Sequence, residues 1–122
     1  MNPTQQLADR YAAVWNEADA ERRRRAIAEL WAPTGAHFVK TREVRGLEAL
    51  QERVTGAYEK NVRERGFLFR ACPNAQRLRD VITFNWEMIR PDSGEVAALG
   101  LEFLQIDEHG LIAVDHQFIV VG

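Results

Sequence analysis

Four side chains of this chain are of the kinds that hold or move protons in an active site: Tyr11, His37, Glu102 and Asp115. Glu102 stands out because it interrupts an apolar run, so its carboxylate either faces a cavity or lies on an outer face. An apolar cavity would disfavour the charged form and raise the pKa of Glu102, and Asp115, if near, would raise that pKa further by charge repulsion. A neutral Glu102 could then donate a hydrogen bond.

Tyr11 lies in the middle of an apolar helical stripe. Its hydroxyl, once buried, needs a partner, so it either reaches the rim or donates into a cavity. The spacing alone favours core packing over a chemical role. That alternative stays open for the whole group, because Glu102, Asp115 and Gln117 could hydrogen-bond one another or Tyr11 and only keep the interior satisfied.

Three amphipathic helices are predicted to position these residues. The first begins with a cap at Asn2 and carries its apolar stripe to about Ala18. The second follows a cap at Asp19 and has Trp31 on its buried side. The third covers residues 47–58.

Two local features of this helical part lead to specific expectations. The arginines at 22–25 span most of a helical turn, which is typical of a solvated face, and the guanidinium of Arg23 is expected to reach water. Pro33 to Gly35 are expected to end the second helix, with a short strand following at 36–39 and the segment to Gly46 forming a loop.

Strands dominate from Phe67 onward, where the pattern changes to period two. They are predicted at 67–69, at 80–90 and as a long hairpin over 96–121 that turns at Asp107 to Gly110. Helices first and strands afterwards indicate an α+β fold, in which the helices cover one face of an antiparallel sheet. No linker or repeat divides the chain, so residues 1–122 are predicted to form one domain.

Composition narrows the functional classes. The formal net charge of −2 argues against nucleic-acid binding, and no apolar run is long enough to cross a membrane. A cytoplasmic location is expected, because the sequence shows no signal peptide and has one cysteine. The three histidines and Cys72 show no ligand spacing, so no metal is expected, and without a phosphate-binding loop no nucleotide cofactor is expected. The chain has two lysines and fourteen arginines, and this imbalance is given no functional weight.

The order of these landmarks resembles the nuclear-transport-factor-two-like superfamily over nearly the whole chain. The motifs that carry the resemblance are DRYAAVWNEAD, AELWAPTGAHFV, VRGLEALQE and LEFLQIDEHGLIAV. The chain looks most like the SnoaL-like, polyketide-cyclase-like branch and, more distantly, ketosteroid isomerase. The resemblance implies three helices packed on a strongly curved, mostly antiparallel sheet. It also implies a cone with an internal apolar pocket, usually in a homodimer packed sheet to sheet.

The resemblance to ketosteroid isomerase also implies residue roles. The tyrosine and the protonated acid that hold the substrate oxygen fall on Tyr11 and Glu102. In that arrangement a tyrosine and a neutral carboxylic acid both donate hydrogen bonds to an enolate oxygen. The general base falls on Val39, which can move no proton, so steroid-type isomerisation by that mechanism is not expected. Asp115 or His37 would be the substitute base.

Period-two alternation predicts which strand residues face the pocket. Gln117 and Asp115 are expected to point inward, and His116 and Phe118 outward onto a dimer face with Thr83, Asn85 and Glu87. The expected pocket walls, besides His37, are Tyr11, Trp15, Trp31, Val39, Phe84, Trp86, Met88 and Leu104.

Two kinds of function follow from this pattern. The first is an acid-base enzyme of the cyclase, isomerase or dehydratase type, acting on an apolar, oxygenated, ring-bearing molecule. The second is a non-catalytic module of the same fold that binds a small apolar molecule or mediates dimerisation. An enzyme needs a base within reach of the ligand, whereas a binding module needs only donors and apolar walls.

Overall fold

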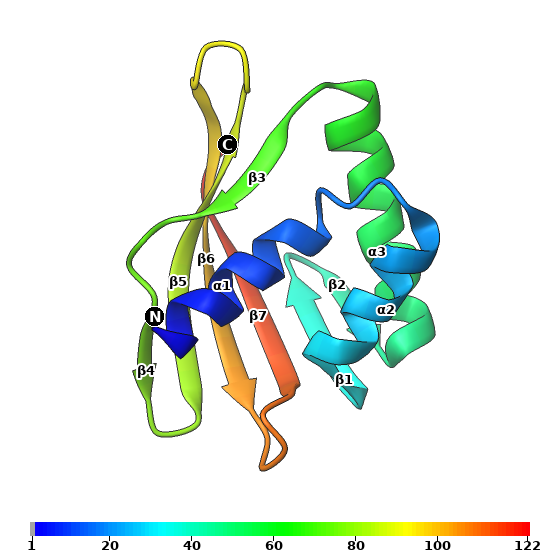
Figure 1. Cartoon of the computed structure of the whole chain (residues 1–122), viewed down its shortest axis with the longest axis vertical. Helices are drawn as coiled ribbons and strands as arrows, with labels where there is room; N and C mark the ends of the chain where they lie inside the picture. The colour runs from blue at the N-terminus through cyan, green and yellow to red at the C-terminus, as the bar shows by residue number, and fades with distance from the viewer. Residues whose placement is uncertain (1) are drawn as a thin grey trace.

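A computed structural model describes residues 2–122, and its centre is a curled seven-stranded sheet with the helices packed against it (Figure 1). The strand order is β2-β1-β7-β6-β5-β3, with β4 paired to β5. The strands are β1 (Trp31–Val39), β2 (Arg42–Arg45), β3 (Leu68–Ala71), β4 (Gln76–Leu78), β5 (Val81–Ile89), β6 (Val96–Ile106) and β7 (Ile112–Val121). The helices are α1 (Pro3–Val14), α2 (Ala20–Leu30), α3 (Leu47–Ala57) and the π-helix η1 (Tyr58–Glu64). The predicted α+β fold is confirmed.

Helix α1 begins as the sequence predicts but ends earlier. The side chain of Asn2 accepts a hydrogen bond from the backbone N–H of Thr4 at 2.9 Å, which caps the first turn. The expectation that the helix continues to Ala18 is wrong, because α1 ends at Val14. Asn16 leaves the helical path and pairs its amide with the backbone of Phe69, donating at 2.7 Å and accepting at 2.9 Å.

Arg23 on α2 is buried, so the expectation that its guanidinium reaches water is wrong. The guanidinium donates to the carbonyl of Glu17 at 2.6 Å and to the hydroxyl of Thr55 on α3 at 3.2 Å, and it lies over the ring of Tyr58. These partners compensate the burial of the charge. Arg23 therefore fastens α2 to α3, while the cap at Asp19 is as predicted.

Strand β1 begins at Trp31, directly after α2, and includes Pro33 and Gly35, which were expected to lie before it. Its pairing with β7 shifts register between Trp31 and Ala36. A proline has no N–H for the ladder, so a register shift is where a strand accommodates it. The strand predicted at 36–39 is the second half of β1 and precedes α3 as expected, whereas the loop expected up to Gly46 is wrong, because residues 42–45 form β2.

The first and last strands in the sequence lie side by side within the sheet. β1 and β7 are parallel neighbours, whereas the other pairings of the sheet are antiparallel. In this pair His37 lies opposite Asp115, and Val39 lies opposite Gln117. Two side chains from segments that are far apart in the sequence are thereby placed on the same face of the sheet.

Alternation on β5, β6 and β7 follows the prediction. Ile82, Phe84 and Trp86 are buried against the helices. Phe103 and Phe118 are exposed on the outer face, 40% and 53% respectively. The predicted hairpin turn is also present, where Gly110 adopts φ +81° and its N–H donates to the carbonyl of Asp107 at 3.1 Å. No helix within residues 2–122 is long and apolar enough to span a membrane.

Candidate functional site: a buried carboxylate pair below a cationic mouth

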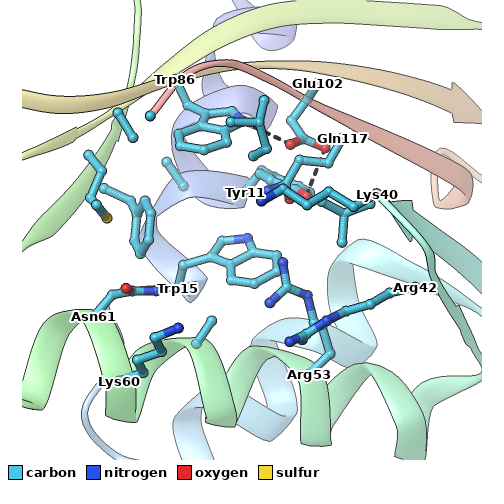
Figure 2. A pocket seen from close by; sticks show the side chains of 18 of the residues that line it. Tyr11, Trp15, Lys40, Arg42, Arg53, Lys60, Asn61, Trp86, Glu102 and Gln117 are labelled. Atoms are coloured by element: carbon cyan, nitrogen blue, oxygen red, sulfur yellow. Dashed lines mark hydrogen bonds between the residues drawn. The ribbon is translucent and has the colours of Figure 1, made fainter.

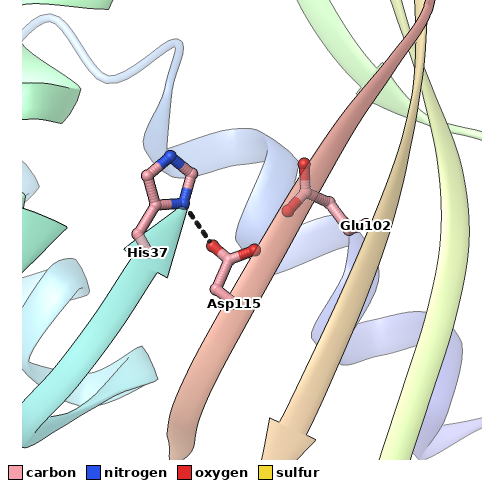
Figure 3. A group of neighbouring side chains, drawn as sticks. All are labelled: His37, Glu102 and Asp115. Carbon is pink, nitrogen blue, oxygen red and sulfur yellow. Dashed lines mark hydrogen bonds and ion pairs between the residues drawn. The ribbon is translucent and has the colours of Figure 1, made fainter. Parts of the chain in front are cut away.

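Tyr11 links the two buried carboxylates. Its hydroxyl lies 2.6 Å from Oδ2 of Asp115 and 3.0 Å from Oε2 of Glu102. Asp115 Oδ2 also contacts Nδ1 of His37 at 2.8 Å (Figure 3). Neither carboxylate nor His37 has exposed surface. The structure thus brings together all four residues that the sequence proposed for proton chemistry.

Hydrogen-bond geometry indicates where the protons lie. Nε of Arg53 donates to Nε2 of His37 at 3.4 Å, so the imidazole proton lies on Nδ1 and points to Asp115. A phenol has one proton, and the shorter contact directs it to Asp115. The contact between Tyr11 and Glu102 then needs a proton from the carboxyl group of Glu102. The arrangement is a chain of donors that ends on the negative charge of Asp115.

The pKa shifts of the two acids agree with this assignment. Burial raises the pKa of Glu102 well above its ordinary value, and the negative charge of Asp115 raises it further. Burial alone would also raise the pKa of Asp115, but hydrogen bonds from Glu102, His37 and Tyr11 hold it below its ordinary value. Burial and the charge of Asp115 raise the pKa of Tyr11, which stays a phenol. Glu102 is therefore the neutral acid and Asp115 the anion.

Trp86 holds the second oxygen of Glu102, because its Nε1 donates to Oε1 at 2.9 Å (Figure 2). This position of the indole depends on Gly100 of the neighbouring strand. A Cβ at Gly100 would lie 2.0 Å from the ring of Trp86, which no side-chain arrangement tolerates. Gly100 is thus needed for a close approach of ring to backbone rather than for a turn.

His37, Glu102 and Asp115 could each offer one metal-ligand atom, and these atoms lie within 4.8 Å of one another. Hydrogen bonds with Tyr11, Trp86 and His37 already engage three of the four carboxylate oxygens, and only Oδ1 of Asp115 is without a partner in the described chain. A cation would have to displace these bonds. The donor set fits a network that shares protons better than it fits a metal centre.

A cavity of about 350 Å³ opens above this network. The predicted residues that line it are Tyr11, Trp15, Val39, Trp86, Met88, Glu102 and Gln117. Glu102 borders the cavity but has no exposed surface, so a ligand reaches its oxygen only if a neighbouring side chain moves. Figure 2 shows Gln117 next to Glu102, between it and the opening.

Some predicted pocket residues lie elsewhere. Trp31, Phe84 and Leu104 do not line the cavity but are packed in the core below it, so the expectation that they form its walls is corrected. Their side chains are buried as predicted, but the ring of Tyr11 packs on Trp31 and Phe84, at 5.4 and 5.5 Å between ring centroids, on the side toward the cavity. His37 and Asp115 lie behind Tyr11 and also do not line the cavity. Val39, at the position implied for the general base, does line it.

Sequence reasoning missed a set of charged residues around the opening, which we call the cationic mouth: Lys40, Arg42, Arg53, Lys60 and Arg65. Lys40 is in the turn between β1 and β2, and Arg42 begins β2. Arg53 is on α3, and Lys60 is on η1. The signal that could have found them was the rarity of lysine, because both lysines of the chain belong to this set.

Comparisons with known proteins agree on the fold. The chain matches no protein-family model, and no curated protein matches it in sequence. A solved structure from Agrobacterium tumefaciens, provisionally named an isomerase of the SnoaL-like family, is 25% identical, with 98% of each chain covered and a TM-score of 0.87.

Two further solved structures share the fold at lower identity. An NTF2-like protein of unknown function from Exiguobacterium is 16% identical over 93% of this chain and 97% of its own, with a TM-score of 0.70. A protein from Sinorhizobium meliloti provisionally named a polyketide cyclase is 15% identical over 92% and 93%, with a TM-score of 0.65. The predicted resemblance to the nuclear-transport-factor-two-like superfamily and its SnoaL-like branch is confirmed.

Proposed function

We propose that this protein binds a small, ring-bearing, oxygenated molecule in its cavity and acts on it by acid-base chemistry, as a cyclase, isomerase or dehydratase. One observation carries the proposal: Tyr11 and Glu102 belong both to the buried proton-sharing network and to the wall of the cavity. The names of the SnoaL-like isomerase and the polyketide cyclase support an enzyme of this fold.

The network supplies the acid half of such a reaction. The hydrogen-bond geometry around Tyr11 places a proton on Glu102, and burial together with the charge of Asp115 raises the pKa of Glu102, which favours that protonated form. That proton can pass to a carbonyl oxygen as an enol forms, or to a hydroxyl group as it leaves. The apolar walls formed by Trp15, Met88 and Val39 would hold the ring body and exclude water.

The base half of the reaction remains a prediction for Asp115 and His37. Both lie one side chain behind the cavity, so either would act through Tyr11 rather than by touching the substrate. This placement, together with Val39 at the implied base position, is what favours the alternative of a non-catalytic binding module.

Binding is tested first, by calorimetric titration with 2-naphthol, a two-ring compound with one oxygen. Tyr11→Phe is expected to weaken binding about tenfold, because one buried hydrogen bond to the ligand is lost. The matched control is Tyr58→Phe, since Tyr58 is the only other tyrosine of the chain and lies under Arg23, away from the cavity. Equal weakening in both variants, or no binding by wild type, would sink the proposal.

Catalysis is separated from binding by proton exchange. With 2-tetralone in D₂O, wild type is expected to exchange the protons beside the carbonyl faster than buffer does, and Glu102→Gln to lose this effect. NMR integrates those protons directly. Binding of 2-naphthol without accelerated exchange would favour the non-catalytic module.

We further propose that two copies pack through the outer sheet face, as the resemblance implies. Phe103 and Phe118 support this, because two large apolar side chains are exposed on neighbouring strands of that face, beside Thr83 and His116. Phe118→Lys is expected to convert a dimer into a monomer in light scattering. A wild-type monomer at micromolar concentration would remove this proposal.

A further inference from the structure

The cationic mouth concentrates positive charge on a chain that is negative overall. Five cations line the cavity, although the formal net charge is −2. The acidic residue among the lining residues is Glu102, which the hydrogen-bond geometry around Tyr11 assigns as the protonated acid. The opening of the cavity therefore carries a positive charge that its own walls do not balance.

Nearby acids do not neutralise the mouth either. Glu43 on β2 pairs with Arg45 at 2.9 Å, and Glu59 and Glu64 on η1 pair with Arg63 at 3.2 and 3.8 Å. Within residues 2–122, none of the five mouth residues forms an ion pair. Arg53 and Arg65 contact the rings of Trp15 and Phe67, so the charges that are free to meet a ligand are those of Lys40, Arg42 and Lys60.

Arg53 is the mouth residue nearest the proton-sharing network. Its guanidinium lies 5.1 Å from the ring centroid of Trp15 and donates to His37. Burial lowers the pKa of Arg53, and the positive charge of Arg42 lowers it further. Two guanidinium groups that repel each other at the edge of a cavity would both be stabilised by an anion between them.

Lys40 occupies an unfavourable backbone conformation. Its φ is +52° in the tight turn between β1 and β2, where glycine or asparagine fits without strain. A lysine there costs about 1 kcal/mol relative to glycine. Arg79, with φ +54° in the turn between β4 and β5, bears the same cost away from the cavity, so the position of the Lys40 side chain matters here rather than the strain. Here the side chain of Lys40 reaches the cavity opening (Figure 2).

Trp15 adds an unused donor inside the cavity. The indole is 94% buried, since its exposed fraction is 6%, and its Nε1 has no hydrogen-bond partner in the part of the chain that the structure describes. Figure 2 shows the ring turned into the pocket between Tyr11 and Lys60. The indole of Trp31 also lacks a partner, but it is packed in the core, whereas the N–H of Trp15 lies at the cavity and is available to a ligand acceptor.

We propose that the ligand of this cavity is an amphipathic organic anion, with an apolar ring body, an oxygen at Tyr11 and Glu102, and a carboxylate or phosphate held by the cationic mouth. This names the ligand class for the proposed function and rests on it. It also replaces the purely apolar ligand that the sequence suggested. The mouth cations without ion pairs support the negative charge of the ligand, and the N–H of Trp15 supplies a further donor for one of its oxygens.

Three probes that share one ring system test whether the cavity prefers a negatively charged ligand. 6-Hydroxy-2-naphthoate carries an oxygen at one end and a carboxylate at the other, its methyl ester keeps the shape without the charge, and 2-naphthol has the oxygen alone. By calorimetry in low salt, the carboxylate is expected to bind about tenfold more tightly than the ester. This advantage is expected to shrink in about 0.5 M salt, because salt screens exposed charges.

Variants locate the effect. Arg42→Gln and Lys60→Gln are each expected to weaken binding of the carboxylate more than binding of the ester, and so to reduce the advantage of the carboxylate. Arg45→Gln is the matched control, because Arg45 lies on the same strand as Arg42 and does not line the cavity. Equal affinity for carboxylate and ester would overturn the anion inference and leave the proposed function standing. Failure of all three probes to bind wild type would overturn both.

Discussion

The inner and outer ends of one cavity are built on opposite electrostatic principles. At the inner end, Tyr11, Glu102, Asp115 and His37 satisfy one another, and one negative charge is surrounded by donors. At the outer end, the five residues of the cationic mouth form no ion pair within the described chain. Four interior side chains thus hydrogen-bond one another without a ligand and leave only Oδ1 of Asp115 without a partner in the described chain, whereas the mouth cations form no ion pair.

Removing the anion of the interior should have the largest effect. Asp115→Asn is expected to destabilise the fold by about 3 kcal/mol at pH 7, because Tyr11 and His37 lose a charged acceptor in a buried place. Urea unfolding measures this, with Asp92→Asn, which is exposed, as the control. A loss no larger than that of the control would mean that Asp115 is not the anion. Hydrogen bonds lower the pKa of Asp115 in the folded protein. Its contribution to the free energy of unfolding is therefore present at pH above the ordinary pKa of an aspartate and is lost as pH falls through the folded pKa.

A methyl group at Gly100 should have the next largest effect. Gly100→Ala would push the ring of Trp86 away and break its bond to Glu102, with an expected loss of about 2 kcal/mol. A loss of near-ultraviolet ellipticity from the tryptophan would accompany it. Gly56→Ala is the control, since a Cβ there meets nothing within 4 Å.

Glu102→Gln should cost little, under about 1 kcal/mol, because glutamine mimics a protonated acid. The pH dependence sharpens this test. The pKa of Glu102 is raised in the folded protein. Its contribution to the free energy of unfolding is therefore full at pH below the ordinary pKa of a glutamate and is lost as pH rises through the folded pKa. Wild type is therefore expected to lose stability relative to Glu102→Gln as pH rises. A constant difference across pH would contradict the assignment of the proton.

Neutralising the mouth should have the smallest effect on the fold. Arg42→Gln and Lys60→Gln are expected to change the free energy of unfolding by less than about 0.5 kcal/mol, since exposed charges without partners contribute little. Thermal unfolding without ligand checks this. A large loss would show that the mouth cations stabilise the protein itself.

The sequence was sufficient for the fold and for much of the interior network. Period-two alternation placed Glu102, Asp115 and His37 on the inner face, and the apolar run around Glu102 indicated its burial. Their mutual contacts were not predictable, because His37 meets Asp115 only through the parallel pairing of β1 with β7. The local sequence of neither strand shows that β1 pairs with β7.

The mouth was not predicted for a different reason. Its residues come from a turn, a strand, two helical segments and a loop, so no periodicity connects them. Long charged side chains on such segments are usually solvated, and only the three-dimensional arrangement shows that these five surround one opening. Trp31 was predicted on the buried side of the second helix but is the first residue of β1. β1 follows α2 without a break, and a single apolar residue at such a junction fits the pattern of a helix and of a strand equally well.

The parallel pairing of β1 with β7 also has a consequence for folding. Its contacts join residues that are 78 positions apart, so they form late relative to the local hairpin of β6 and β7. Until β7 meets β1, Asp115 has no imidazole beside it and the cavity has no closed inner end. Acquisition of the site and completion of the sheet should therefore be one kinetic event, with no intermediate that binds ligand before the last strand pair has closed.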